Sequence, residues 1–178
     1  KDRKKLADGL SALLADTYLL YISGTMPPHV SMEKITYLWS QPVKVYLEQG
    51  GVPTGWNEPI GLPAEIVPFN KPTNVLAGSS YTGRVRSEGK PVAGTEIEIE
   101  YMAAEPDMKA NKPTKPKASP MPGGSVVAVT DDNGMFTFGI PKAGFWGFAA
   151  LGVGPAKQHQ GKELSQDAVL WVRAYDVK

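Results

Sequence analysis

The chain has 178 residues, no cysteine, and a net charge of +1 from 19 basic and 18 acidic residues. The missing cysteine excludes disulfides, thiolate catalysis and cysteine-bound zinc. The charges are mostly interspersed, which argues against a field that would attract anionic lipid or nucleic acid, and we expect no nucleic-acid partner. The 19 glycines and 16 prolines favour many short elements joined by turns, which is typical of an all-β protein.

No apolar run reaches the roughly 20 residues that a membrane-spanning helix needs, so the chain is not expected to span a membrane. It opens on Lys1-Asp2-Arg3-Lys4-Lys5 without an initiator methionine. We therefore expect a mature or truncated form whose upstream residues are missing here.

Residues 1–50 predict a small, incomplete, β-rich N-terminal domain. Leucines at helical spacing over 6–14 predict a short helix. An aromatic and branched run at 18–22 predicts a strand, as do the segments 35–40 and 43–48. Three strands do not close a sandwich, so this unit is expected either to lack preceding strands or to lean on the rest of the chain.

Residues 51–63 are dense in glycine and proline and predict a linker. We expect a β-sandwich domain over 64–178, with about seven strands. Its strands are predicted at 65–69, 81–86, 96–101, 126–130, 136–140, 145–151 and 168–175.

Two connections of the predicted sandwich stand out. Asp131-Asp132-Asn133-Gly134 begins like a calcium loop, but the next positions are Met135 and Phe136, so we interpret it as the tight turn of a β-hairpin. Residues 103–124 are rich in proline and lysine and poor in branched apolar residues. They predict an extended or mobile solvated loop, with partner docking as the alternative.

A set of turn and strand residues in this region resembles carboxypeptidase-regulatory and prealbumin-like modules. The set consists of Gly83-x-Val85, Gly89-Lys90-Pro91-Val92-Ala93-Gly94, Ile97-x-Ile99, Thr130-Asp131-Asp132-Asn133-Gly134-x-Phe136-x-Phe138, Pro141 and Gly144. The expected fold is thus an immunoglobulin-like or prealbumin-like β-sandwich. Gly94 and Gly134 are expected to have positive φ, and Phe136 and Phe138 to fill the space between the sheets.

Four longer segments extend the resemblance to roughly 17–172. They are Gly55-Trp56-Asn57-Glu58-Pro59-Ile60-Gly61-Leu62, Glu65-Ile66-Val67-Pro68, Gly144-Phe145-Trp146-Gly147-Phe148-Ala149-Ala150-Leu151 and Asp167-Ala168-Val169-Leu170-Trp171-Val172. Together they resemble the periplasmic, often membrane-anchored accessory components encoded with nickel and cobalt transporters. The resemblance implies export, a periplasmic or other extracytoplasmic location, no enzymatic activity, and capture of nickel or cobalt beside a membrane ABC-type metal transporter.

The two histidines of the chain are the candidate metal ligands, because nickel and cobalt prefer imidazole with some carboxylate support. His159 falls in a predicted loop before the last strand, in a His-x-Gly-Lys pattern that the resembled family shares. His29 follows two prolines, with Met26 and Met32 nearby. The alternatives are a surface or structural role for His159 and a solvated turn for His29.

Three glutamates at alternating positions, Glu96, Glu98 and Glu100, are expected on one face of one strand, about 7 Å apart. They would hold a hard cation only if other ligands converged, so we interpret them as a solvated outer face. Arg84 and Arg86 are expected on a strand of the other sheet under a prealbumin-like topology.

Several aromatic residues are candidates for either packing or binding. Trp56, beside Glu58 in the predicted linker, is expected to wedge the two domains together, and a small ligand such as a sugar or peptide in that cleft is one hypothesis. Phe145 and Trp146 are expected in the core, because the flanking glycines allow close packing.

The sequence carries no zinc-protease helix, nucleophile elbow, phosphate-binding loop or dinucleotide fingerprint, so we expect a non-catalytic protein. The first functional hypothesis is an exported accessory protein that binds or presents nickel or cobalt. The second is a structural or protein-interaction module of the cell envelope without metal. The third is the small-ligand protein with an interdomain cleft.

Overall fold

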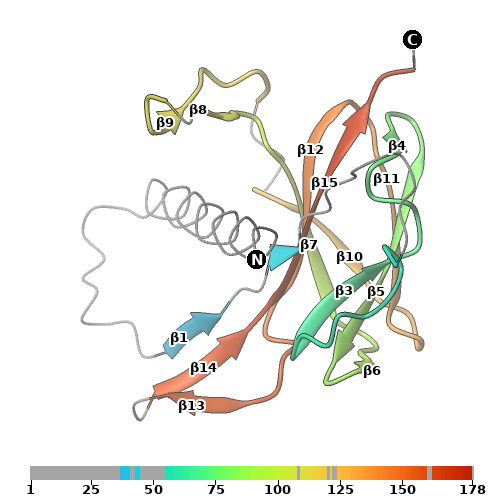
Figure 1. Cartoon of the computed structure of the whole chain (residues 1–178), viewed down its shortest axis with the longest axis vertical. Helices are drawn as coiled ribbons and strands as arrows, with labels where there is room; N and C mark the ends of the chain where they lie inside the picture. Colours follow the sequence, from blue (N-terminus) through green and yellow to red (C-terminus); the bar gives the residue numbers. More distant parts are fainter. Residues whose placement is uncertain are drawn as a thin grey trace, which may run out of the picture.

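The structure is a computed structural model that describes residues 37–40, 43–44, 55–107, 109–119, 121, 124–159 and 162–177. Over these residues every regular element is a strand, and no helix is long and apolar enough to cross a membrane. Two sheets face each other, with a small third sheet and a short separate ribbon beside them (Figure 1). The predicted all-β sandwich is therefore confirmed.

The larger sheet of the sandwich has six strands. Along the sheet they are β10 (Val126–Val129), β7 (Glu96–Tyr101), β12 (Gly144–Ala150), β15 (Ala168–Tyr175) and β2 (Val43–Lys44), and β4 (Val75–Leu76) also pairs with β15. The smaller sheet has four strands. They are β11 (Met135–Gly139), β5 (Ser80–Ser87) and β3 (Ala64–Pro68), with β6 (Lys90–Pro91) paired to β5.

All seven strands predicted for the sandwich are present, and each predicted boundary lies within one residue of the observed one. Strict alternation explains this accuracy. In β7 the isoleucines Ile97 and Ile99 are fully buried, whereas Glu96, Glu98 and Glu100 point to the opposite face and are exposed or half-buried. A strand with one apolar and one polar face is stable only at the surface of a core.

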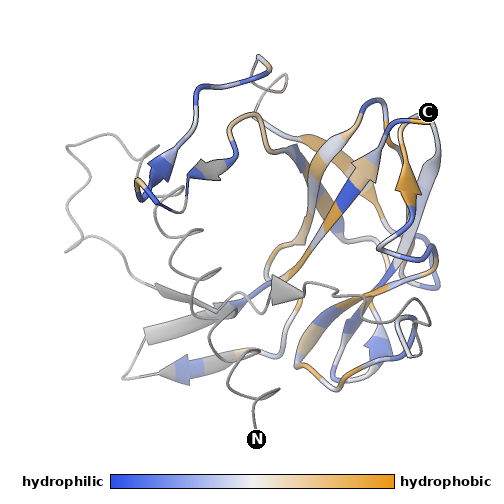
Figure 2. Ribbon diagram, turned by 45° about the horizontal axis from the view of Figure 1, so that its top comes forward, coloured by the Kyte–Doolittle hydropathy of each residue, from blue (hydrophilic) through white to orange (hydrophobic). Residues whose placement is uncertain are grey.

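An aromatic cluster fills the space between the two sheets. Phe148 of β12 stacks on Tyr81 of β5 at 5.1 Å between ring centroids and meets Phe136 at 5.5 Å. Trp146, two residues earlier on β12, is also fully buried, and its indole N–H donates to the carbonyl of Lys142 across 3.0 Å. Figure 2 shows the hydrophobic residues concentrated on the strands of the two facing sheets. Phe136 and Phe138 therefore contribute to the core as predicted.

The turn at 131–134 is present, but the β-hairpin predicted around it is wrong. Gly134 has a φ of +72°, and its N–H donates to the carbonyl of Asp131. The strands on either side do not pair with each other: β10 pairs with β7, and β11 pairs with β5. The turn therefore passes the chain from one sheet to the other, because both flanking strands have an apolar side that must face the same core.

The segment 103–124 forms a hydrogen-bonded ribbon at its outer part, which differs from the extended or mobile loop that its composition predicts. Its two short strands are β8 (Pro106–Asp107) and β9 (Lys112–Pro113), and they pair antiparallel. Most of its residues are exposed, so the expectation of a solvated insertion is correct. Local turn and backbone hydrogen bonds order the ribbon without a hydrophobic core.

The third sheet joins an early segment to a late one. It contains β1 (Tyr37–Ser40), β14 (Lys162–Gln166) and β13 (Lys157–His159), in that order. β1 and β2 fall within the predicted strands 35–40 and 43–48, and β2 pairs in parallel with β15 of the sandwich. The predicted helix at 6–14 and strand at 18–22 lie outside the described residues, and the division at 51–63 stays a prediction.

Candidate functional site

Trp56 and Glu58, the predicted interdomain residues, lie in a tight turn. The N–H of Glu58 donates to the carbonyl of Gly55 across 3.2 Å and closes that turn. Trp56 is half-buried and Glu58 is exposed. Residues 45–54 lie outside the described part of the chain, so the wedge between two domains and its ligand cleft stay predictions.

His159 is the last residue of β13, so its predicted position in a loop is wrong. β13 and β14 form a hairpin in which His159 lies opposite Lys162. β14 also pairs in parallel with β1, with Tyr37 opposite Glu163. The backbone of His159 and the start of β1 therefore lie at the same end of the three-stranded sheet, where β14 begins.

The other candidate metal ligand, His29, lies outside the described residues. It precedes Tyr37 by eight residues, a separation that an extended chain spans over at most about 29 Å. In the third sheet β14 lies between β13, which ends at His159, and β1, the first described strand after His29 in the sequence. The sequence does not predict this pairing, because β1 and β14 are more than 100 residues apart and parallel pairing leaves no local signal.

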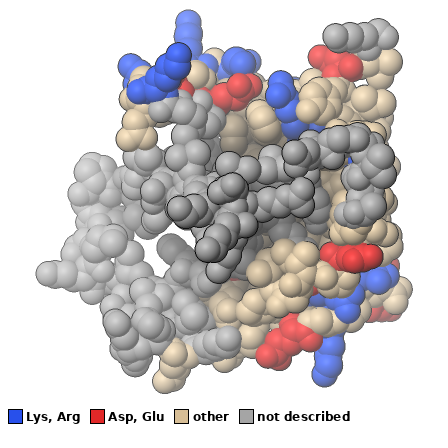
Figure 3. All heavy atoms as spheres, in the orientation of Figure 1, with Lys and Arg blue, Asp and Glu red and all other residues tan. Residues whose placement is uncertain are grey.

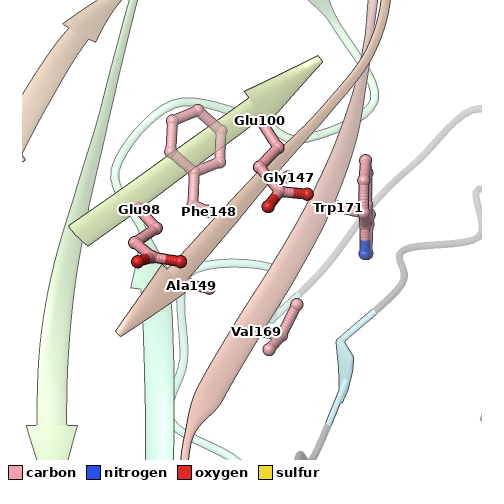
Figure 4. Close-up of a pocket in the computed structure, with 7 residues that line it drawn as sticks. All are labelled: Glu98, Glu100, Gly147, Phe148, Ala149, Val169 and Trp171. Atoms are coloured by element: carbon pink, nitrogen blue, oxygen red, sulfur yellow. The ribbon is translucent and has the colours of Figure 1, made fainter. Parts of the chain in front are cut away.

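The outer face of the six-stranded sheet carries the glutamates of β7. Glu98 lies opposite Ala149 and Glu100 opposite Gly147 on β12, and the next strand places Val169 and Trp171 beside those two small residues. The lack of large side chains on β12 leaves a shallow hollow between the glutamates and the tryptophan. Figure 4 shows the two carboxylates and the indole around it.

Burial raises the pKa of the Glu100 carboxyl above 4.5, and the neighbouring Glu98 carboxylate raises it further. Both causes disfavour a second negative charge at this place. Neither carboxylate has a hydrogen-bond or ion-pair partner in the part of the chain that the structure describes. A positively charged group beside the pair would relieve their repulsion, so the hollow suits an ammonium or guanidinium group better than an anion.

Trp171 covers its neighbour on β12. A Cβ atom placed on Gly147 would lie 2.9 Å from the six-membered ring of Trp171, so only glycine lets the indole lie flat on the sheet. Further along the same face, the Arg173 guanidinium lies 5.2 Å from the ring centres of both Phe145 and Tyr175. Phe145 is thus half-buried on the outer face, and its predicted place in the core is wrong because neighbouring strand residues point to opposite faces.

The buried polar residues of the sandwich serve its connections. Asp167, which is 2% exposed, joins β14 to β15 and accepts the N–H of Gly152 across 2.7 Å. Glu65 is equally buried and accepts the N–H of Ile60 across 3.1 Å. The amide of Gln166 donates to the carbonyl of Pro155. These contacts fix loops to strands.

Metal ligands do not converge within the described residues, where no group of three or more histidine, aspartate or glutamate side chains could hold an ion. In the turn at 131–134, Asp131 Oδ1 accepts the N–H groups of Asn133 and Met135, each at 2.8 Å. That oxygen is occupied by hydrogen bonds within the turn, in agreement with the prediction of a tight turn instead of a calcium loop. Arg84 and Arg86 lie on β5, in the sheet opposite β7, also as predicted.

Comparison with known proteins identifies a family without assigning a function. A protein of Archaeoglobus fulgidus, described as an uncharacterized protein, is 46% identical to this chain over 43 residues. Those residues are 24% of this chain and 31% of the relative, so the match spans about a third of the relative's length. Residues 19–154 match a family described as a domain of unknown function, DUF4198. Since this match covers most of the sequence, the chain belongs to the DUF4198 family.

Proposed function

We propose that this protein is a non-catalytic, extracytoplasmic accessory protein that binds nickel or cobalt and presents the ion to a membrane ABC-type metal transporter. His159 and His29 supply the imidazole ligands. The observation that carries this proposal is the third sheet, which holds the β13–β14 hairpin beside β1. The only two histidines of the chain are His29, eight residues before β1 in the sequence, and His159, at the end of β13.

The ligand chemistry favours a late first-row metal over a hard cation. Imidazole suits nickel, cobalt, copper and zinc, whereas calcium and magnesium need several oxygen ligands. Imidazole binds metal only when neutral, and its ordinary pKa of about 6.5 makes binding pH-dependent. Binding is therefore expected at pH 7.5 and is expected to weaken as the pH falls below about 6.5.

The accessory role rests on two further points. The segments at 55–62, 65–68, 144–151 and 167–172 resemble accessory components of nickel and cobalt transporters. The sequence also lacks recognised catalytic motifs, which supports a binding protein over an enzyme.

Titration calorimetry of the full chain with nickel and with cobalt at pH 7.5 tests this proposal. We expect saturable binding of about one ion per chain. His159→Ala is expected to weaken it by more than ten-fold, because even outer-sphere partners of metal ligands contribute about 10- to 100-fold. Gln158→Ala, an exposed position of the same strand, is the matched control. Unchanged affinity in both His159→Ala and His29→Ala would show that the histidines are not the ligands.

A second candidate function is a structural or protein-interaction module of the cell envelope without metal. The edge strand β10 favours it. Val127 and Val129 on its outer face are 50% and 59% exposed, and the strand carries no charged residue. Uncharged apolar edge strands are prone to pair with other chains. A titration without saturable heat for either metal would leave this function as the better account.

A further inference from the structure

The ribbon over residues 103–119, here called the lysine ribbon, stands away from the sandwich (Figures 1 and 2). Backbone hydrogen bonds hold it together beyond its two short strands. The backbone N–H of Lys117 donates to the carbonyl oxygen of Ala103 across 2.7 Å. The backbone N–H of Thr114 donates to the carbonyl oxygen of Glu105 across 2.8 Å. The described residues of the ribbon therefore form a hydrogen-bonded projection whose lysine side chains are exposed.

The lysines of the ribbon form a local concentration of positive charge, although the net charge of the whole chain is only +1. Lys109, Lys112, Lys115 and Lys117 are all exposed and lie within nine residues. Lys and Arg atoms gather over this corner of the molecule in Figure 3. The ribbon carries these four lysines against two carboxylates, Glu105 and Asp107, so its local charge is positive.

Only part of this charge is neutralised within the ribbon. Lys117 forms an ion pair with Glu105 across 3.2 Å. The Asp107 Oδ1 atom accepts the backbone N–H groups of Lys109 and Ala110, each at 3.0 Å, and so stabilises the turn between the strands. Within the described residues, the ammonium groups of Lys109, Lys112 and Lys115 have no carboxylate partner.

The composition of the ribbon identifies the kind of surface that it fits. It has no arginine for bidentate phosphate recognition and no aromatic ring on which a base could stack, which argues against nucleic acid. It also lacks the buried aromatic or arginine anchors that usually dominate protein interfaces. Flexible lysines on an exposed projection suit a diffuse layer of negative charge.

We propose that the lysine ribbon binds the surface of a bilayer that contains anionic phospholipids. Each lysine near such a surface increases partitioning about five-fold, and the three unpaired lysines together about 100-fold. This strength positions a protein at a membrane but does not anchor it alone, because stable attachment takes a second signal. The inference needs no metal and is independent of the function proposed above.

Sedimentation of the full chain with phospholipid vesicles, in the absence of metal, tests the inference. At about 50 mM salt we expect binding to vesicles of phosphatidylcholine with 30% phosphatidylglycerol and none to pure phosphatidylcholine. Binding is expected to fall steeply as salt rises, since the Debye length shortens. Lys112→Gln with Lys115→Gln is expected to reduce partitioning roughly 25-fold.

The matched control is Lys90→Gln with Lys142→Gln, which removes the same charge from exposed positions outside the ribbon. We expect this variant to bind anionic vesicles nearly as well as the unaltered chain. Three results would overturn the inference: no binding to the anionic vesicles, equal binding to the neutral ones, or an equal loss in both double variants. Circular dichroism establishes that each variant is folded.

Discussion

Glu100 is a residue whose charge the fold disfavours. Its pKa is raised by burial and by Glu98, so the folded state holds the proton more tightly than the unfolded chain does. Between the ordinary pKa of 4.5 and the raised folded value, the folded state binds more protons than the unfolded state. The contribution of Glu100 to stability therefore declines as the pH rises through this window and stays lower above it.

Glu100→Gln should consequently make the protein more stable at pH 7, and the difference should vanish below pH 4.5. Chemical denaturation at a series of pH values measures this. Glu96→Gln, which removes a carboxylate from the exposed end of the same strand, is the matched control. Equal stability of Glu100→Gln and the unaltered chain at pH 7 would contradict the assigned environment.

Gly147 is the second residue whose identity the outer face requires. Gly147→Ala would press a methyl group into the Trp171 ring, so we expect a loss of about 1–3 kcal/mol in the free energy of unfolding, together with a shift in tryptophan fluorescence. Gly139→Ala, in strand β11 with open space around the added atom, should change stability by less than about 0.5 kcal/mol. A neutral Gly147→Ala would mean that the indole does not lie on the glycine.

At the scale of elements, successive side chains of β12 point alternately to the core and to the outer face of the sheet. Phe148→Ala removes a fully buried ring that contacts Tyr81 and Phe136 and should cost about 3–5 kcal/mol. Phe145→Ala, three residues away on the opposite face, should cost about 1 kcal/mol through its contact with Arg173. Thermal and urea denaturation of the two variants compare these values directly. Similar losses in both would contradict the assignment of faces.

The strands were predictable because the alternation of apolar and polar residues within a strand marks its buried and exposed faces, as in β7. The sequence did not predict which strands pair with each other. The residues of the turn at 131–134 are compatible with a hairpin and with a connection between two sheets. Only the packing of both flanking strands on the shared core decides between these two arrangements. The β13–β14 hairpin escaped prediction because Lys157–His159 and Lys162–Gln166 are mostly polar, so no apolar alternation marks them.

The candidate sites were likewise predictable within one strand but not across strands that are distant in the sequence. The glutamates of β7 were predicted on a shared face, but the hollow also needs Gly147 opposite Glu100 and Trp171 beyond it. These three residues come from three strands, and their alignment depends on register between distant segments. His159 was predicted from its ligand chemistry and from the His-x-Gly-Lys pattern, whereas its place in a sheet with β1 depends on the parallel pairing of β1 with β14.

At the scale of the molecule, the sandwich carries two projections with different proposed roles. The third sheet extends from one region of it and carries His159, and the lysine ribbon extends from another (Figure 1). Metal binding and membrane contact would then occur on separate parts of one protein. This separation suits an accessory protein that holds an ion beside a membrane transporter.

Competitive titration of the full chain with nickel, cobalt and magnesium at pH 7.5 and pH 5.5 is the decisive test of binding through imidazole. We expect saturable binding of nickel or cobalt at pH 7.5, a large loss at pH 5.5 as imidazole is protonated, and no competition from a thousand-fold excess of magnesium. Absence of saturable nickel and cobalt binding at pH 7.5, or displacement of these ions by magnesium, would contradict it.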